Sequence, residues 1–413
     1  MSEHIIFHID VNSAFLSWSA LARLEAGSDV DLRLIPSIVG GDIAKRRGVV
    51  LAKSIPAKAF GISTGEPVAN ALRKCPTLVS VPPDRELYHR QSTRLMEYLS
   101  GISPDIEQVS IDECYMDYSP IAANYTSPEE AAALIKDTVF EKFGFTVNVG
   151  ISDRKVLAKM ASDFKKPNLV HTLYAREIQE KLWPLPVSSL FMCGRSSVDT
   201  LRKLGILTIG ELAKADPVIL EAHLKSHGVT LWNYANGRDD SPVLSEPAKM
   251  KGVGNSTTLA ADAETRDDAA KTLLELAESV SSRLRASEQL AGLVCTEIKY
   301  NTFQTASHQA VLDVPTSSTD VIYRQALTLF DELWDGTPIR LLGIRTAKLV
   351  SDSEPVQLNL FDYKKPVSEK QQKLDAALDQ IRRRFGDNAI TRGSLLNSAH
   401  TAESSYEDGR NST

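Results

Sequence analysis

Cysteine is scarce in this sequence, with four residues in 413, and their spacing excludes two kinds of cross-link. Cys75, Cys114, Cys193 and Cys295 form no CxxC pair and no Cys/His pair. A disulfide framework and a structural zinc site both depend on such groupings. We therefore predict four free cysteines that serve as small, mostly buried apolar side chains.

Long hydrophobic runs are also absent, because no segment approaches the roughly 18 uninterrupted apolar residues that span a membrane. The first ten residues carry His8 and Asp10 within an apolar run and lack a basic leading segment, which predicts a strand rather than a signal peptide. An apolar content of 42% and a charged content of 24% are typical of soluble globular proteins. We expect a soluble, cytoplasmic protein that does not associate with membranes.

The chain has no excess of positive charge. Its net charge of −6 and its pI near 5.8 do not indicate nucleic-acid binding, which usually depends on clustered Lys and Arg. An uneven distribution of charge would weaken this objection. Basic clusters do occur at 45–47, 165–166 and 382–384.

A chain of 413 residues is too long for one compact core, so we expect several domains. The hydrophobic pattern predicts a strand at 1–10, helices at 13–25 and 85–99, a hairpin at 105–118, a helix at 128–143 and a strand at 145–151. This order is the split βαβ pattern of a ferredoxin-like sheet, within a multidomain α+β fold. A turn-rich segment at 32–80 is predicted to be a small inserted subdomain.

The rest of the chain changes character several times. Residues 154–164 predict an amphipathic helix with Lys155 and Lys159 on its polar face. Residues 185–235 are helical throughout, and 238–251 is a polar segment that we interpret as a linker. A second α+β pattern begins at 255. The apolar residues of a last amphipathic helix are Leu374, Leu378, Ile381 and Phe385.

Three carboxylates are candidates for chemistry. Asp10 ends the first strand, and Asp112 and Glu113 lie in a hairpin of the same predicted sheet. Phosphoryl transfer from a nucleoside triphosphate uses two hard cations held by carboxylates. Because adjacent strand residues point to opposite faces, Asp112 and Glu113 can share a metal site only where the pleat is broken at a turn, and we predict such a break. The alternative is a solvent-facing strand end and an ordinary hairpin turn.

Four motifs, in order along the chain, resemble those of Y-family DNA polymerases, and the DinB-type bacterial members most closely. They are DVNSAF at 10–15, SIPAKAFG at 54–61, SIDE at 110–113, and the stretch 150–167 that runs from GIS through LAK to KP. The similarity extends to about Arg345. The domains it implies are a palm at 1–30 and 76–170, fingers at 31–75, a helical thumb with a helix-hairpin-helix at 171–237, a linker at 238–250, an α+β little finger at 251–350, and a clamp-binding motif with a C-terminal helix and tail at 351–413.

The resemblance also implies a metal site. Asp10, Asp112 and Glu113 would be the catalytic residues and would hold two Mg²⁺ ions, together with the backbone carbonyl of Val11. His8, His89 and His171 have no metal-ligand spacing, and we expect each to be an ordinary hydrogen-bonded or solvent-facing histidine.

The substrate residues follow from the same motifs. The resemblance implies that Phe15 is a steric gate, whose ring leaves no room for a ribose 2′-OH, and that Ser54, Lys58 and Lys166 contact the incoming nucleotide. The alternatives are a core aromatic for Phe15 and ordinary solvated side chains for the two lysines.

The chain departs from the family pattern at several of these positions. Family members usually have an acidic residue and an aromatic where this chain has Asn12 and Ala14, and Tyr and Arg where it has Ile55 and Lys58. Two directional hydrogen-bond donors to the triphosphate are thereby lost. We expect a higher KM for the nucleotide and an unchanged metal site.

DNA contacts are implied in two places. Residues 192–212 resemble a helix-hairpin-helix, which implies phosphate contacts at Gly194 and Arg195, with Met192 where the first glycine is usual. A plain helical hairpin is the alternative. Residues 241–345 contain 10 Lys and Arg against 14 Asp and Glu, so the domain expected to hold DNA is net acidic. We predict weak, salt-sensitive binding through a locally basic strand face at Lys299, Arg340 and Arg345.

A short apolar motif would compensate for weak DNA binding. The segment QLNLF at 357–361 resembles the pentapeptide by which bacterial polymerases bind the sliding clamp. The implied contacts are Gln357, Leu358, Leu360 and Phe361. The alternative is an apolar cluster that packs on the preceding domain.

The sequence therefore predicts a monomeric, low-fidelity, template-directed DNA polymerase for translesion synthesis, which acts on primer-template DNA with dNTPs. A different class of function is a catalytically weak, clamp-tethered DNA-binding adaptor, which Ile55, Lys58 and Met192 favour. A nucleotide cyclase is a third hypothesis, because GGD at 40–42 resembles a cyclase signature. Ile43 and Ala44 follow, however, where that hairpin needs Glu and Phe.

Overall fold

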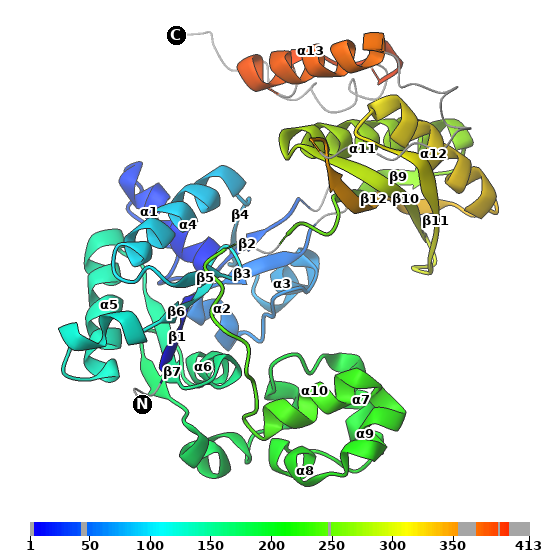
Figure 1. The fold of residues 1–413 in the computed structure, drawn as a ribbon. Coiled ribbons are helices and arrows are strands. Elements are labelled where there is room, and N and C mark those ends of the chain that lie inside the picture. Colours follow the sequence, from blue (N-terminus) through cyan, green and yellow to red (C-terminus); the bar gives the residue numbers. More distant parts are fainter. Residues whose placement is uncertain (1–3, 43–47, 247–248, 354–368, 387–388, 396–413) are drawn as a thin grey trace, which may run out of the picture. The chain divides into compact units, whose positions relative to one another are not determined.

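The computed structural model describes residues 4–42, 48–246, 249–353, 369–386 and 389–395. They divide into two compact units, one formed by the described residues before 247 and the other by those from 249 onward. Each unit has its own sheets and helices and is treated separately (Figure 1). In the part of the chain that is described, no helix combines the length and the apolar character needed to cross a membrane.

The first unit is built on a five-stranded sheet in the order β5-β6-β1-β7-β8. The central strand β1 pairs antiparallel with β6 and β7, and β7 pairs parallel with β8. This is the predicted split βαβ sheet. The strands are β1 (Ile6–Val11), β5 (Ile106–Gln108), β6 (Glu113–Asp117), β7 (Val147–Ser152) and β8 (Val170–Thr172).

Helices cover the two faces of this sheet unequally. One face packs on α1 (Ala14–Glu25), α4 (Arg85–Ser100) and α5 (Pro128–Phe143), which together form the main core of the unit. The other face carries α6 (Lys155–Ser162), which contacts β7 and β1. Side chains alternate between the faces of a strand, so Phe7, Ile9 and Val11 of β1 are buried in the main core, and His8 and Asp10 point to the α6 side.

A glycine lets α6 approach the sheet closely. A Cβ atom on Gly150 of β7 would lie 2.0 Å from the carbonyl oxygen of Ala158 and 2.4 Å from the amide of Ser162. Because both neighbours are backbone of α6, any side chain at residue 150 would push the helix away. The glycine in the GIS motif therefore brings α6 and the residues after it over the carboxylate strands.

A smaller three-stranded sheet, in the order β3-β2-β4, forms the inserted subdomain. Its elements are β2 (Ser37–Gly40), β3 (Val50–Lys53), β4 (Val79–Val81), α2 (Ile55–Ala59) and α3 (Val68–Lys74). Its core includes Ile38, Val50 and Val68, while Leu51, Ile55 and Phe60 are exposed.

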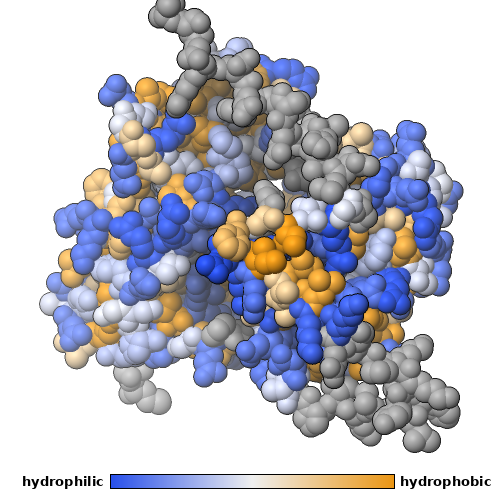
Figure 2. All heavy atoms as spheres, turned by 90° about the horizontal axis from the view of Figure 1, so that it is seen from above, coloured by the Kyte–Doolittle hydropathy of each residue, from blue (hydrophilic) through white to orange (hydrophobic). Residues whose placement is uncertain are grey.

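On the face drawn in Figure 2, hydrophilic residues cover most of the surface and hydrophobic residues form smaller groups.

The helical segment comprises α7 (Arg195–Lys203), α8 (Ile209–Lys214), α9 (Pro217–Leu224) and α10 (Ser226–Ala235). Leu201, Leu212 and Leu220 are buried in its core. Gly210 lies inside α8, where a Cβ atom would come within 3.0 Å of Trp183.

The first half of the predicted linker is hydrogen-bonded to α6 of the first unit. Asp239 accepts a hydrogen bond from the amide of Val156 at 2.9 Å, and the Pro242 carbonyl accepts one from Lys155 Nζ at 3.1 Å. Lys155 also contacts Glu107 at 2.6 Å and is buried. The prediction that Lys155 belongs to a polar, solvent-facing side of its helix is therefore wrong. Its amine joins Glu107 of β5 to the linker at Pro242.

The second unit contains a four-stranded sheet in the order β11-β10-β12-β9, with two helices packed on it. The strands β9 (Gly254–Ala263) and β11 (Thr305–Thr316) were not predicted from the sequence. The remaining elements are β10 (Gln289–Tyr300), β12 (Ile339–Ser351), α11 (Arg266–Ala286) and α12 (Thr319–Leu333). All four cysteines of the chain are free and buried, which confirms that prediction.

The last helix, α13 (Glu369–Phe385), contacts α11 through charged residues. Asp375 and Asp379 are buried and pair with Arg285 of α11, at 3.6 Å and 2.6 Å. Leu374 and Phe385 are exposed. The expectation of an apolar contact face is therefore wrong at these two positions, because acidic side chains point inward instead.

We expect Arg285→Met to detach α13, because the buried Asp379 would lose its ion-pair partner at 2.6 Å and Asp375 the nearer of its two cations. Removing one partner of a buried ion pair costs about 3 kcal/mol or more, so amide-exchange protection across α13 should fall by roughly 100-fold. Burial opposes ionisation, but Arg285 keeps the pKa of Asp379 below its ordinary value, so docking should also weaken as the pH falls through that lowered value. Arg324→Met, at a 73% exposed side chain, is the control. Equal protection of α13 in both variants would contradict the charge-based docking.

Candidate active site

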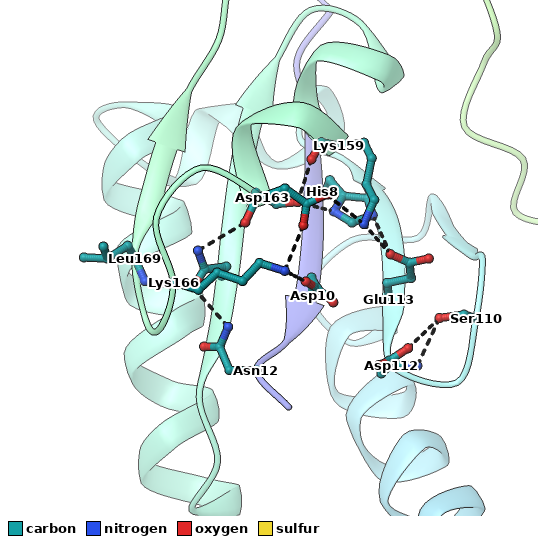
Figure 3. A network of polar contacts seen from close by, with 12 residues as sticks. His8, Asp10, Asn12, Ser110, Asp112, Glu113, Lys159, Asp163, Lys166 and Leu169 are labelled. Atoms are coloured by element: carbon teal, nitrogen blue, oxygen red, sulfur yellow. Dashed lines mark hydrogen bonds and ion pairs between the residues drawn. The ribbon is translucent and has the colours of Figure 1, made fainter. Parts of the chain in front are cut away.

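The centre of the five-stranded sheet places three polar side chains in one row on the α6 face. Asp10 of β1 lies opposite Glu113 of β6 on one side and opposite Asn148 of β7 on the other. Directly opposed residues of antiparallel strands have Cβ atoms about 5 Å apart. The carboxylates of Asp10 and Glu113 are therefore neighbours (Figure 3).

Asp112 precedes β6 in a bend, where the regular pleat is interrupted as predicted. Its backbone carbonyl accepts a hydrogen bond from the amide of Val11 at 3.0 Å, which ties the bend to the end of β1. Its carboxylate accepts a hydrogen bond from Ser110 Oγ at 2.7 Å. The bend thus holds Asp112 beside the strand that carries Asp10 (Figure 3).

Two lysines from α6 and the loop after it face these carboxylates. Lys159 Nζ lies 2.7 Å from Glu113 Oε2, and Lys166 Nζ forms an ion pair with Asp10. Asp163 lies between the two amines, 2.9 Å from Lys166 and 3.4 Å from Lys159. Although burial opposes it, the carboxylates raise the pKa of both lysines, so both amines are charged at neutral pH.

His8 belongs to this cluster, and we did not predict a role for it. It is buried on the same face of β1 as Asp10, two residues earlier in the strand. Its Nδ1 lies 2.8 Å from Ser162 Oγ, and its Nε2 lies 3.4 Å from Glu113 Oε2. Burial lowers the pKa of His8, while the contacts with His8 and Lys159 hold the pKa of Glu113 at about 2. The period-2 pattern of the first strand puts His8 on the face of Asp10, which is the signal that identifies it.

The donor set fits a hard divalent cation. It consists of carboxylate and backbone oxygens, which are the ligands that Mg²⁺ prefers. Burial, together with the charges of Asp10 and Glu113, raises the pKa of Asp112, and a cation would relieve that repulsion. Within the described ranges, no three His, Cys, Asp or Glu side chains are already gathered as a ligand set. The amines of Lys159 and Lys166 hold Glu113 and Asp10 instead.

Phe15 lies in the first turn of α1 and is partly buried. Its ring stacks on that of Tyr88, with centroids 4.6 Å apart and an angle of 19° between the planes. The ring of Trp18, from the next turn of α1, lies beside it, with the two ring centroids 6.3 Å apart. The ring is therefore held in place from two sides, as a gate would require and as a core aromatic would also show.

The fingers residues have different environments. Ser54 is buried, caps α2 by accepting from the amide of Ala57 at 3.0 Å, and donates to the Ile35 carbonyl at 2.7 Å. Its hydroxyl is thus engaged with the backbone as a helix cap, and the substrate contact expected for Ser54 stays a prediction. Lys58 is exposed in the last turn of α2.

The helical hairpin of the thumb carries the next predicted contacts. Gly194 is the N-cap of α7, and Arg195 begins that helix as an exposed residue. Met192 has a φ of 68° and a side chain exposed to solvent. A non-glycine residue thus occupies the left-handed conformation that glycine favours at this turn.

We expect Met192→Gly to stabilise the protein. The left-handed conformation costs an L-residue about 1–2 kcal/mol, and part of the gain is offset by the extra freedom of glycine in the unfolded chain. A net gain of about 0.5–1 kcal/mol should raise the thermal unfolding midpoint of the thumb. Met192→Ala, which keeps a Cβ atom, is the matched control. Equal midpoints for the two variants would show that the turn is not strained.

Lys299, Arg340 and Arg345 lie on β10 and β12 of the second unit. Lys299 and Arg340 flank the exposed ring of Phe303, at 5.1 Å and 4.9 Å from its centroid. Arg345 is exposed and lies 3.6 Å from Glu297. The basic strand face predicted from the sequence is thus small and partly neutralised. The segment 357–361, which the sequence predicts to bind the sliding clamp, lies outside the described residues.

Comparisons with known proteins agree with this arrangement. The impB/mucB/samB family matches residues 9–163, and the C-terminal domain of that family matches residues 250–360. DNA polymerase IV of Clostridium acetobutylicum is 45% identical over 95% of this chain and 98% of its own length. DNA polymerase IV 1 of Bacillus subtilis is 35% identical over 95% of this chain and 93% of its own length.

A solved structure shows the same fold. A Y-family DNA polymerase chimera superposes with a TM-score of 0.72 at 22% identity, covering 84% of this chain and 99% of its own. Its fold agrees with the α+β sheets and helical segment described above. This chain belongs to the Y-family of DNA polymerases, among the DinB-type members, and is a DNA-directed DNA polymerase.

Proposed function

We propose that this polymerase joins a dNTP to a primer 3′-OH with two Mg²⁺ ions held by Asp10, Asp112 and Glu113, and releases pyrophosphate. The observation that carries the proposal is the register of β1 and β6, which sets Asp10 opposite Glu113, with Asp112 at the bend one residue earlier. When bound, the ions activate the attacking hydroxyl and neutralise the leaving phosphates. The backbone carbonyl of Val11 would complete the site.

The chain's own residues orient the nucleotide. Lys166 is 36% exposed at its side chain and is paired with Asp10, so its amine becomes available when a cation takes its place on that carboxylate. Lys58 adds a second, solvent-facing cation. Point charges suit a triphosphate but direct it less well than a guanidinium does, which supports the expectation of a high KM for the dNTP.

Translesion synthesis of low fidelity is the biological role we propose. The fingers consist of a three-stranded sheet and two short helices, and such a small subdomain places few restraints on a distorted base pair. The second unit offers few cations for DNA, so affinity for primer-template DNA should be weak and salt-sensitive. A sliding clamp bound at 357–361 would compensate. We propose a monomer that acts in the cytoplasm.

The test is extension of a labelled primer on an undamaged template and on one with an abasic site, with the four dNTPs and Mg²⁺. We expect extension on both templates, and none with EDTA. If the folded protein extends neither primer at low salt, even with clamp added, the clamp-tethered adaptor becomes the better explanation.

A further inference from the structure

Two buried asparagines beside the active site form a pair that the proposed chemistry does not use. Asn12 follows β1, and Asn148 lies opposite Asp10 on β7. Asn12 Nδ2 donates a hydrogen bond to Asn148 Oδ1 at 3.1 Å. Asn148 is fully buried and Asn12 nearly so. Buried amides need partners, and these two find theirs mainly in one loop.

That loop runs between α6 and β8 and carries Lys166. Asn148 Nδ2 donates to the Lys165 carbonyl at 2.8 Å and to the Ser162 carbonyl at 3.2 Å. Asn12 Oδ1 accepts from the amide of Asn168 at 2.9 Å, and Asn148 Oδ1 accepts from the amide of Leu169 at 3.3 Å. The pair therefore fixes the backbone on both sides of Lys166.

The direction of these bonds makes the amide groups necessary. Asn148 Nδ2 faces two carbonyl oxygens, so a carboxylate there would put oxygen against oxygen. Asn12 Nδ2 faces Asn148 Oδ1, so a carboxylate at residue 12 would meet the same repulsion. The backbone of Asn168 is in the left-handed region, with a φ of 60°, and its amide is held by Asn12. The loop conformation thus depends on both side chains.

We infer that the Asn12–Asn148 pair is a positioning device that aims Lys166 at the triphosphate of the incoming nucleotide. This inference rests on the proposed function. Both polar groups of the Asn12 side chain bond to protein groups, its donor to Asn148 and its acceptor to the Asn168 amide, which supports a positioning role for this residue. Asn12 and Asn148 are positioning residues, because they act through Lys166.

The test measures the KM for dNTP and kcat in primer extension for Asn12→Asp and Asn148→Asp. Each carboxylate has nearly the same shape as the amide that it replaces, and it puts an acceptor oxygen where the amide has an N–H donor. We expect the KM to rise about tenfold, with kcat changed less than about threefold. The reason is that Lys166 is no longer held in position, which weakens nucleotide binding. If residue 12 were a metal ligand, Asn12→Asp would keep or raise kcat and leave the KM low, which would overturn the inference.

A mutant cycle separates this mechanism from general damage. In a Lys166→Met background, Asn12→Asp should raise the KM less than about twofold further, because the lysine through which it acts is gone. An undiminished tenfold effect in that background would show that Asn12 does not act through Lys166. If Lys166→Met alone leaves the KM unchanged, the role of Lys166 fails, and the positioning claim fails with it, while primer extension itself would still support the polymerase.

Hydrogen exchange provides a readout besides activity. The amides of Asn168 and Leu169 should lose protection in Asn12→Asp, because repulsion between the new carboxylate and Asn148 Oδ1 separates the two side chains that hold these amides. The amides of β1 and β7 should keep theirs. Protection retained at both loop amides would contradict the inference whatever the kinetics show. Asn12→Ala, which removes both the acceptor for the Asn168 amide and the donor to Asn148, replaces Asn12→Asp if that variant does not fold.

Discussion

Asp112→Asn and Glu113→Gln are each expected to lower the rate of primer extension by roughly a thousandfold or more. Each change removes one negative charge from the place where two divalent cations are proposed to bind, and charge stabilisation by such ions is worth several kcal/mol. About 4 kcal/mol corresponds to a factor of roughly 1,000 in rate. Single-turnover extension with saturating dNTP and Mg²⁺ measures the loss directly.

The control for this prediction is Asp117→Asn. Asp117 lies at the other end of β6, where its carboxylate accepts a hydrogen bond from the amide of Ser119 at 2.8 Å, away from the carboxylate row. Asp117→Asn replaces a carboxylate with an amide, as the two test variants do, and it lies on the same strand. It should leave primer extension nearly unchanged. If Asp112→Asn and Glu113→Gln retain activity close to that of Asp117→Asn, the three carboxylates do not form the catalytic site.

Much of the palm could be predicted from local patterns. The period of two in β1 and the helical periods of α4 and α5 reflect burial on one face, and burial leaves a direct trace in the sequence. The helix at 128–143 was predicted with the bounds that the structure shows, because Ser127 caps it and Gly144 ends it with a φ of 74°. The break at Asp112 followed from the need for adjacent carboxylates to share a site.

Other features depend on contacts between distant segments, which no local pattern reveals. His8 contacts Glu113 and Ser162, and Asn148 holds residues 14 to 21 positions later in the chain. The same reason explains the inward acidic face of α13, because Asp375 and Asp379 pair with Arg285, which lies on another helix about 90 residues earlier. β9 and β11 were missed because several of their side chains are exposed, so their apolar alternation is weak.

Phe15→Ala is expected to lower the selectivity for dNTPs over ribonucleotides by roughly 100-fold, which corresponds to about 2.7 kcal/mol. The Phe15 ring is held by its stacking on Tyr88 and by Trp18, so it cannot turn aside to admit a 2′-OH. If Phe15 is the gate, as we predict, removing the ring opens that space, while the proposed metal ligands Asp10, Asp112 and Glu113 stay in place. The measurement is kcat/KM for a dNTP and for the matching ribonucleotide on the same primer-template.

The competing interpretation of Phe15 is a core aromatic, and the same variants distinguish the two. A core role predicts lower stability and equal losses of kcat/KM for both nucleotides, because a loosened α1 affects both alike. A gate predicts that kcat/KM for the ribonucleotide rises while that for the dNTP falls.

Phe15→Leu should show a smaller change in selectivity, since it keeps most of the volume. Tyr88→Phe keeps the stacked ring and removes only the hydroxyl that bonds Ser19 at 2.9 Å, so its selectivity should match the wild type. Selectivity that follows stability across all three variants would mean that Phe15 supports α1 and excludes nothing.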